Sequence, residues 1–468
     1  MLVPDGTGGL RAPPRPASDK AFRDMVRPFE DALRERVVHD SSFPIPPLSY
    51  EQFVDSYHGA KKKRYHEAVQ SLVRDPIIHR DAHVNSFVKV EKINFTAKPD
   101  PCPRLIQPRT FRFGAALGKH IKHIEKPLFK KIADIYGGNT VLKGLDCIGV
   151  AESLKQMWEE FDNPVAIGLD ASRFDQHCSR AALSWEHTIW ELLCTDKEEV
   201  RMLLAMQLRN VGRVYTEEGI IKYTTDGCRM SGDMNTSSGN CLLMCAMVYS
   251  YCKSIGLTKF RLANNGDDCV LIVERNRVKR LNTLQDWFTR AGYTMKVEDP
   301  VYEFEQIVFC QTQPVFDGVG YRMVRDPRVS MAKDLTSTLN CKERHVRERW
   351  MAAMRHGGNS LVVGVPVLGA FYNMYPDSGI RTSSRDTITA NITESGMWRM
   401  IPKLRQVERP ICDSSRYSFW LAFGITPDNQ LGLEERFANI NLGLCAVTDQ
   451  VEYSEVTHLV DNTLPRYQ

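Results

Sequence analysis

The spacing of apolar residues predicts a helix followed by a buried strand near the middle of the chain. Between Val150 and Phe161, apolar side chains recur every three or four positions, which is the period of one helix face. The turn residues Asp162–Pro164 then end the helix. The next segment, Val165–Asp170, is short and apolar, and its last residue is an acid. We expect a core strand with a carboxylate at its end.

Further along the chain, the pattern predicts a buried helix and then a hairpin. Residues 237–255 are apolar on almost every side and precede Gly256, as in a buried helix that ends at a glycine. Strand-like runs at 260–263 and 269–274 flank the Asn-Gly pair of Asn264–Asp268, which is a strong hairpin signal. Two adjacent acids therefore lie at the tip of a predicted β-hairpin.

The remaining patterned segments predict alternating helices and strands. A helix over 278–291 is expected to stop at a glycine, and strands are expected over 293–297, 302–309 and 313–316. From about residue 320 onward the pattern is largely helical, with irregular insertions. There is no internal repeat and no long linker. We therefore expect an α+β fold whose subdomains are interleaved along the chain.

Composition indicates a large globular protein. The chain has 468 residues, of which 43% are hydrophobic and 25% charged, and no apolar run reaches the roughly 20 residues that a transmembrane helix needs. The best candidate, Leu361–Tyr372, is interrupted by glycine and proline. The amino-terminal stretch lacks the apolar segment of a secretory signal. These features predict an intracellular protein without a transmembrane segment of its own.

Cysteine and histidine spacing gives little support for a disulfide framework or a zinc site. The thirteen cysteines include no Cys-x-x-Cys pair, and their odd number favours reduced, packed thiols. His120 and His123 are spaced for one face of a helix, but a pair without a nearby third ligand is more often core or solvated histidine. We therefore expect no zinc site.

Positive charge is concentrated in one stretch of the chain. The net charge is only +4, yet residues 61–130 contain 16 Lys and Arg against 6 Asp and Glu. Such a local surplus predicts a polyanion as partner. For the run Lys61–Arg64, a solvated face is an equally good interpretation, and a nuclear localisation signal is a third.

The carboxylates of the predicted hairpin and strand suggest a metal site. By themselves, Asp267 and Asp268 fit an exposed acidic turn. If a sheet sets the strand that ends at Asp170 beside the hairpin, however, three carboxylates come together. Oxygen ligands of this kind suit Mg²⁺ or Mn²⁺ and not zinc. Two such ions can stabilise both the attacking and the leaving oxygen of a phosphoryl transfer.

Three ordered motifs resemble those of a known enzyme family. DASRFD at 170–175, SGDMNTSSGN at 231–240 and GDD at 266–268 look like motifs A, B and C of viral RNA-dependent RNA polymerases. The strings SGDMNT and NNGDD are similar to those of the tombusvirus, carmovirus and umbravirus-like group of plus-strand RNA viruses. GDD alone is weak evidence, but the ordered triplet is specific. The resemblance extends over about residues 85–315.

The resemblance implies a closed right-hand polymerase of the α+β class, with fingers, a palm built on an antiparallel sheet and a mainly helical thumb. The basic stretch 61–130 would then lie in the fingers and line the paths of template and NTP. The implied division is an N-terminal extension and fingers at 1–160, palm with motif A at 161–180, a fingers insertion at 181–225, palm with motifs B to E at 226–318, and thumb at 319–468.

The resemblance also implies a metal site and a ribose-sensing pair. Asp170 and Asp267 would be the principal ligands of two Mg²⁺ or Mn²⁺ ions, with Asp268 assisting. Asp175 is expected to face Asn235, and such a pair senses the ribose 2′-hydroxyl of the incoming nucleotide in this family. A polar site built to bind a hydroxyl can reject a ligand that lacks it by up to about 10⁴- to 10⁵-fold. RNA is therefore the expected product.

Motif F of the family, which roofs the nucleotide entry channel, is resembled by residues 88–114. Lys89, Lys92, Arg104 and Arg109 sit at matching places and would bind the NTP triphosphate, since cations, and the planar arginine fork above all, suit phosphate oxygens. The sequence departs from the family pattern directly after Arg109.

Further roles follow from the resemblance around the predicted site. Ser231 would begin the flexible motif B loop, and Thr236 would add a hydroxyl near the ribose; the alternative for both is helix capping. Lys296 matches the motif D lysine that protonates the pyrophosphate leaving group. Cys310 and Gln311 resemble part of motif E, which supports the primer or priming nucleotide.

The resemblance thus implies an RNA-directed RNA polymerase that replicates a plus-strand viral genome, with an RNA template, NTPs and de novo initiation. The family implies an auxiliary replicase protein as partner and membrane-bound replication complexes in the host cytoplasm. A reverse transcriptase is the nearest alternative, but it normally excludes the 2′-hydroxyl by bulk. A noncatalytic RNA-binding or coat-associated protein would use the basic stretch alone and would leave the carboxylates unexplained.

Overall fold

The chain folds into two compact units, each assembled from three separate stretches. The computed structural model describes residues 3–4, 9–92, 102–339, 343–377, 401–402, 407–440 and 442. The first unit consists of Met1–Lys89, Pro103–Val141 and Ile167–Asp299, and the second of Val90–Cys102, Leu142–Ala166 and Pro300–Gln468. The chain thus passes repeatedly between the units, in keeping with the absence of a linker in the sequence.

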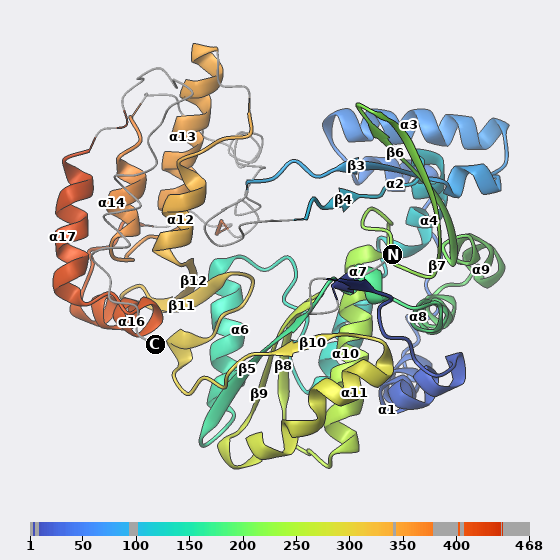
Figure 1. The fold of residues 1–468 in the computed structure, drawn as a ribbon, viewed down its shortest axis with the longest axis horizontal. Helices are drawn as coiled ribbons and strands as arrows, with labels where there is room; N and C mark the ends of the chain where they lie inside the picture. The colour runs from blue at the N-terminus through green and yellow to red at the C-terminus, as the bar shows by residue number, and fades with distance from the viewer. Residues whose placement is uncertain are drawn as a thin grey trace. The chain divides into compact units, whose positions relative to one another are not determined.

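The first unit contains both helices and sheets (Figure 1). Its helices are α1 (Asp19–Val38), α2 (Tyr50–Asp55), α3 (Gly59–Arg74), α4 (Phe111–Ile121), α5 (Glu125–Tyr136), α7 (Phe174–His177), α8 (Arg180–Leu193), α9 (Lys197–Ala205), α10 (Thr236–Ser254) and α11 (Leu284–Ala291), with the 3₁₀ helices η1 (His79–Ala82) and η2 (Arg275–Thr283). Its strands are β1 (Val3–Pro4), β2 (Leu10–Arg11), β3 (Val84–Val88), β4 (Leu105–Ile106), β6 (Arg209–Thr216), β7 (Gly219–Asp226), β8 (Arg261–Asn265), β9 (Asp268–Glu274) and β10 (Met295–Val297). Strand β5 (Pro164–Ala171) begins in the second unit and continues into the first.

A four-stranded sheet with the order β10–β5–β9–β8 carries the predicted acids. β5 pairs antiparallel with β10, and β8 pairs antiparallel with β9. The residues Val270–Val273 of β9 each expose 1% or less of their surface, as expected of an apolar core strand. Helix α10 packs against β8 and is buried on nearly all sides, because its sequence is apolar all round. The strand, helix and hairpin predicted here are confirmed.

A second sheet has the order β4–β3–β6–β7. Its β3–β4 and β6–β7 pairs are antiparallel, whereas β3 and β6 run parallel. Buried and exposed residues alternate along β6, which is typical of a strand with one solvated face. This sheet positions both ends of the segment predicted to bind triphosphate, since Lys89 follows β3 and Arg104 precedes β4.

Two predicted elements are wrong. Residues 302–309, expected as a strand, contain the 3₁₀ helix η3 (Phe304–Gln306), because the buried Phe304 and Ile307 are three positions apart, as in a 3₁₀ turn. The helix expected over 278–291 is α-helical only in α11. The preceding η2 is rich in charge and buries Leu281 alone, so it offers little apolar surface to hold a regular helix on the core.

In its described residues, the second unit is mainly helical and also holds the two-stranded sheet of β11 and β12. Its elements are α6 (Cys147–Glu159), η3, β11 (Thr312–Phe316), β12 (Tyr321–Arg325), α12 (Pro327–Asp334), α13 (Arg344–Leu361), α14 (Leu368–Asn373), α16 (Asp413–Phe423) and α17 (Pro427–Ala438). No helix in the described part of the chain combines the length and the hydropathy of a membrane span. Every cysteine among the described residues is a free thiol, most of them buried, as their spacing predicted.

Candidate active site

Asp170 and Asp267 lie at the ends of neighbouring strands. Asp170 is the penultimate residue of β5, and β5 is hydrogen-bonded directly beside β9. The β8–β9 connection is a two-residue loop, Gly266 and Asp267, between the paired residues Asn265 and Asp268. Gly266 has a φ of 86°, a conformation that a tight hairpin loop requires and that glycine adopts without strain. Residues 170 and 267 thus lie at the ends of adjacent strands of one sheet, and their shared role as metal ligands stays a prediction.

The side chain of Asn264 stabilises this loop through two hydrogen bonds to Gly266. It is fully buried, its Nδ2 donates to the Gly266 carbonyl at 2.7 Å, and its Oδ1 accepts from the Gly266 N–H at 3.3 Å. These two bonds hold the turn that carries Asp267. Asn264 was considered in the sequence only as part of a hairpin signal, and its stabilising role depends on the burial that the fold provides.

The acids of the loop and strand repel each other. Loss of hydration raises the pKa of Asp267, and its own backbone N–H lowers it. The charge of Asp170 raises this pKa further, whereas the charge of Arg104 lowers it. Asp170 and Arg104 are therefore both close enough to Asp267 to act on it, and the carboxylates are only partly compensated by the protein.

The three predicted metal ligands do not converge tightly on one point. Within the described ranges, the ligand atoms of Asp170, Asp267 and Asp268 do not all lie within 4.8 Å of one another. Asp170 and Asp267 are exposed, and Asp268, the first residue of β9, is half-buried. Separation of like charges is the expected arrangement for carboxylates without a cation between them.

The histidine prediction needs a correction, because His120 does have acidic neighbours. Its Nε2 lies 3.1 Å from Glu199, and the ligand atoms of His120, Asp196 and Glu199 lie within 4.8 Å of one another. The ammonium of Lys119 also contacts Glu199, at 2.9 Å. A lysine already compensates this carboxylate, so we interpret the cluster as an ion-pair network between α4 and α9. His123 instead contacts the carbonyl of Pro46, at 2.7 Å.

The predicted partner of Asp175 is wrong: the carboxylate faces Asn240, not Asn235. Asn240 Nδ2 donates to Asp175 Oδ1 at 2.8 Å. Asn235 precedes α10, is fully buried, and donates to Glu186 Oε1 at 2.9 Å. Burial raises the pKa of Asp175, and the Asn240 hydrogen bond and the charge of Arg229 oppose this shift.

A buried network behind Asp175 explains the exchange of the two asparagines. Arg229 forms a buried ion pair with Glu186, and its Nε donates to Asn240 Oδ1 at 3.1 Å. Burial alone would raise the pKa of Glu186, but the Arg229 charge and hydrogen bond lower it, so this carboxylate stays ionised. Asn235 contributes to the far end of the network as a donor to Glu186. Glu186 and Arg229 were missed in the sequence because each is informative only beside the other.

The hydroxyls of Ser231 and Thr236 are held by backbone carbonyls. Ser231 Oγ donates to Leu105 in β4 at 2.8 Å, and Thr236 Oγ1 donates to Met230 at 2.8 Å. Helix α10 has Asn235 as its N-cap, without a side-chain capping bond. Neither hydroxyl therefore caps the helix, which was the alternative prediction for Ser231 and Thr236. The Ser231 bond instead ties the motif B loop to the second sheet.

Arg109 is a structural anchor, which corrects its predicted role in triphosphate binding. Its Nε donates to Asp233 Oδ1 at 2.6 Å, and its other nitrogens donate to the Ala82 carbonyl and to Asn210 Oδ1, both at 2.6 Å. The side chains of Arg109 and Asp233 expose 2% and 3% of their surfaces. A buried guanidinium whose donors are taken in this way cannot reach a triphosphate without breaking the core.

Two of the other predicted triphosphate ligands, Lys89 and Arg104, lie at the end of the β3–β4 ladder. The Lys89 N–H donates to the Arg104 carbonyl at 2.8 Å, which continues the pairing of the two strands and places these residues side by side. Arg104 is exposed and acts on the charge of Asp267. Lys92 is half-buried.

Lys296 lies directly opposite Asp170. The two residues are register partners in the antiparallel β10–β5 pair, so their side chains leave the same face of the sheet. Both are exposed. The structure thus brings Lys296 to the edge of the acidic site.

Cys310 and Gln311 form a tight turn between the paired residues Phe309 and Thr312. Both have positive φ values, 52° and 60°. Gln311 is exposed and accepts from Lys333 Nζ at 3.4 Å. The turn belongs to the second unit.

Comparison with known proteins identifies the family. A family model described as viral RNA dependent RNA polymerase matches residues 5–444. The chain belongs to this family. It is 43% identical over 438 residues to the RNA-directed RNA polymerase of Cymbidium ringspot virus, which covers 92% of this chain and 51% of that protein. It is 42% identical over 446 residues to that of Tomato bushy stunt virus (strain Cherry), covering 93% and 52%. These matches confirm the resemblance seen in the motifs.

A third relative is also longer than the part that this chain matches. The RNA-directed RNA polymerase of Tobacco necrosis virus (strain D) is 41% identical over 449 residues, which make up 95% of this chain and 61% of that protein. This polymerase-family chain therefore spans between half and two thirds of the length of these relatives.

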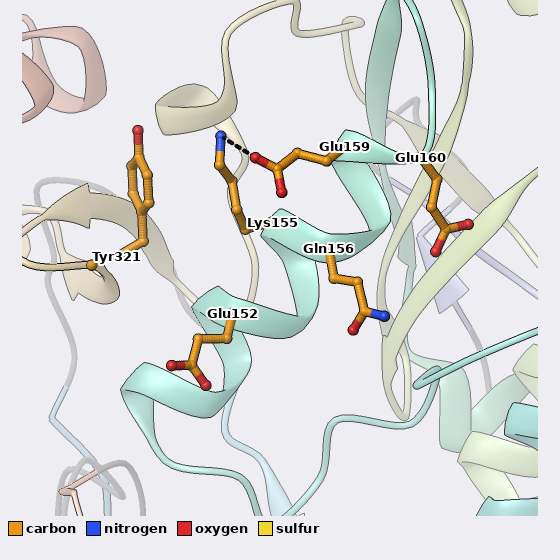
Figure 2. A pocket seen from close by; sticks show the side chains of 7 residues that line it. Glu152, Lys155, Gln156, Glu159, Glu160 and Tyr321 are labelled. Atoms are coloured by element: carbon orange, nitrogen blue, oxygen red, sulfur yellow. Dashed lines mark ion pairs between the residues drawn. The ribbon is translucent and has the colours of Figure 1, made fainter.

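A pocket of about 470 Å³ lies in the second unit. Figure 2 shows that its lining is mostly one face of α6, with the Lys155–Glu159 ion pair of 3.3 Å at its centre. Lys155 also lies over the ring of Tyr321, at 5.3 Å from the ring centroid. None of the residues predicted for the active site lines this pocket, so we do not assign it to the polymerase chemistry.

Proposed function

We propose that this chain catalyses template-directed transfer of nucleotides from NTPs to a growing RNA, as the polymerase of a plus-strand RNA virus. The observation that carries the proposal is the placement of Asp170 and Asp267 at neighbouring strand ends in a member of the viral RNA-dependent RNA polymerase family. The β10–β5–β9–β8 sheet would be the palm of a closed right hand, the β4–β3–β6–β7 sheet part of the fingers, and residues 319–468 the thumb.

The donor set of the site fits divalent cations. Asp170, Asp267 and Asp268 offer only carboxylate oxygens, which suit Mg²⁺ or Mn²⁺. Because the charge of Asp170 raises the pKa of Asp267, a cation held by the two would relieve an existing repulsion. When bound, two such ions stabilise the attacking 3′-oxygen and the leaving pyrophosphate oxygen. The chain itself contributes two rigid strands that hold the ligands.

Selection of ribose is assigned to Asp175 and Asn240. The Asn240 amide uses one oxygen of the Asp175 carboxylate, at 2.8 Å, and we assign the other oxygen as acceptor for the 2′-hydroxyl. Arg229 holds Asn240 through its Nε, so the pair is oriented before the nucleotide arrives. Ser231 and Thr236 would border the same loop, and Asn235 supports the network without touching the ribose.

The triphosphate is assigned to Arg104, Lys89 and Lys92. Arg104 already acts on Asp267, and its planar fork suits two phosphate oxygens at once. Lys296, opposite Asp170, would donate a proton to the pyrophosphate leaving group. General acid assistance of this kind is typically worth about 10² to 10⁴ in rate.

The remaining expectations complete the proposal. The turn at Cys310 and Gln311 would support the priming nucleotide, and initiation would proceed de novo. RNA template, RNA product and NTPs are the substrates and products. An auxiliary replicase protein would bring the chain to membrane-bound replication complexes in the host cytoplasm.

Incorporation of labelled NTPs on an RNA template, in the presence of Mg²⁺, tests the proposal. Asp267→Ala should abolish incorporation and leave RNA binding nearly unchanged, because the carboxylate holds metal and does not fold the hairpin. Glu217→Ala is the matched control, since Glu217 is also an exposed acid at a hairpin tip, between β6 and β7. Full activity of Asp267→Ala, or equal use of dNTPs and NTPs by the unmodified protein, would contradict the proposal.

A further inference from the structure

Two lysines that are 61 positions apart in sequence converge on one aromatic ring. Lys122 Nζ lies 3.4 Å from the centroid of the Tyr57 ring, and Lys61 Nζ lies 4.8 Å from the same centroid. Lys122 also donates to the Ser56 carbonyl at 3.2 Å. The ring sits in an aromatic cluster with Phe53 and other rings of α2, α3 and α4, so the position of both ammonium groups is set by packed side chains.

This pair lacks a matching carboxylate. Burial lowers the pKa of Lys122 to about 8, and the neighbouring charge of Lys61 contributes to this shift, whereas Glu125 opposes it. In the part of the chain that the structure describes, neither lysine is within ion-pair distance of an acid. Lys62, one residue further, is different because it pairs with Asp55 at 2.9 Å. Like charges held together without an anion indicate that the anion comes from another molecule.

The helix that carries Lys61 adds to the positive potential. Helix α3 begins at Gly59 without a side-chain cap, and its first turn contains lysines but no acid. Cations at the amino end of a helix are opposed by the helix dipole, so this arrangement lowers the stability of the isolated protein slightly and favours a bound anion.

The aromatic cluster links the lysine pair to the predicted nucleotide site. Tyr57 Oη contacts Met234 Sδ at 3.8 Å, and Met234 packs against the cluster of Phe53 and Tyr65. Met234 belongs to the loop 231–235 that leads to Asn235 and α10. Tyr57 therefore contacts both the lysine pair, through its ring, and this loop, through its hydroxyl.

We infer that Lys61 and Lys122, supported by Tyr57, form a binding site for a backbone phosphate of the RNA template. The inference rests on the proposed polymerase function for the identity of the strand, and on the geometry of the two ammonium groups for the phosphate. The inference gives the lysines of the basic run 61–64 different roles. Lys61 binds phosphate, whereas Lys62 forms an ion pair with Asp55 of the neighbouring helix α2. Phosphate contacts of this type position the strand and carry no sequence information.

Binding of a short labelled single-stranded RNA to the full chain, measured by fluorescence anisotropy over a range of salt concentrations, tests the inference. Lys61→Gln/Lys122→Gln should weaken binding about tenfold or more, because hydrogen bonds to charged groups are strong. The slope of log affinity against log salt should become shallower by about 0.7 for one lost phosphate contact. Lys62→Gln removes the same charge from the same turn and should change both quantities much less.

Three results would overturn the inference: unchanged RNA binding, an equal loss in Lys62→Gln, or a loss of binding to phosphatidylserine vesicles in place of RNA. The last result would assign the site to an anionic membrane surface. Because Lys122 is half-buried, a thermal melt checks that each variant folds, and Lys61→Gln alone, at an exposed position, should give part of the effect. If the unmodified protein incorporates no nucleotide but the lysine variants still lose RNA, the polymerase proposal fails and the phosphate site stands.

Discussion

Replacing Asn240 by Ala tests the reassignment of the ribose-sensing pair. The substitution removes the Nδ2 donor that lies 2.8 Å from Asp175 and the Oδ1 acceptor of Arg229 Nε at 3.1 Å. Asp175 then loses the partner that orients it. We expect the preference for NTP over dNTP to fall, because the 2′-hydroxyl no longer meets an oriented acceptor.

The magnitude follows from the bonds that are lost. A hydrogen bond to a charged group contributes about 1.5 to 3 kcal/mol, which corresponds to roughly 10- to 100-fold in selectivity. The remaining carboxylate still offers an acceptor, so discrimination should fall by this factor and not by the whole of about 10⁴ to 10⁵ that a hydroxyl-binding site can supply.

The assay compares kcat/KM for an NTP and the matching dNTP on one RNA template. Asn235→Ala is the matched control, since it removes another buried amide only five positions away in the chain. Its amide donates to Glu186, so we expect a loss of stability of about 1 to 3 kcal/mol in urea unfolding with an unchanged NTP preference. The opposite pattern, with selectivity lost in Asn235→Ala and kept in Asn240→Ala, would refute the reassignment.

Three other predictions concern burial and charge. Glu186→Gln leaves Arg229 in the core without its counter-ion and should cost about 3 to 5 kcal/mol of stability in urea unfolding; a cost near zero would mean that the pair is not buried in solution. Arg109→Met should likewise destabilise the fold, by breaking the ion pair with Asp233, and should leave the KM for NTP nearly unchanged in whatever protein remains folded; a raised KM at full stability would restore the triphosphate role. Asp267→Asn should raise the Tm of the metal-free protein at pH 7. The fold raises the pKa of the Asp267 carboxyl above its ordinary value of 3.8, so the folded protein becomes less stable as pH rises from 3.8 through the folded pKa. The neutral amide does not carry this cost. The gain should vanish near pH 3.8 and shrink when Mg²⁺ is added at pH 7, and a gain that is independent of pH would contradict the electrostatic origin.

Local sequence was sufficient for the parts of the site that depend on neighbours in the chain. The Asn-Gly pair indicated a tight hairpin at this point of the chain, and the loop that forms is Gly266 and Asp267, which places Asp267 at an exposed tip. The apolar run before Asp170 specified a core strand whose last residues reach its end. The apolar helix 236–254 was likewise readable, because a segment that is apolar all round has no stable place except the core.

The tertiary structure, in contrast, decided which side chains pair with one another in hydrogen bonds and ion pairs. Asp233 is 124 positions from Arg109, and whether the guanidinium meets this acid or stays free for a ligand depends on where the fold places the loop before α10. The same loop turns Asn235 towards Glu186 and leaves Asn240 for Asp175. The sequence alone does not show which of these two asparagines, five positions apart, faces Asp175. The direction in which the chain enters α10 decides it.

The sequence by itself therefore determined most of the elements and the identity of the acids, because turns, strands and buried helices follow from side chains that are close along the chain. Only the tertiary structure decided which polar groups are used up inside the protein and which remain for ligands. The physical reason is that a buried charge must find a partner within about 3 Å, and in a chain of this size that partner comes from a distant segment whose approach no local pattern encodes.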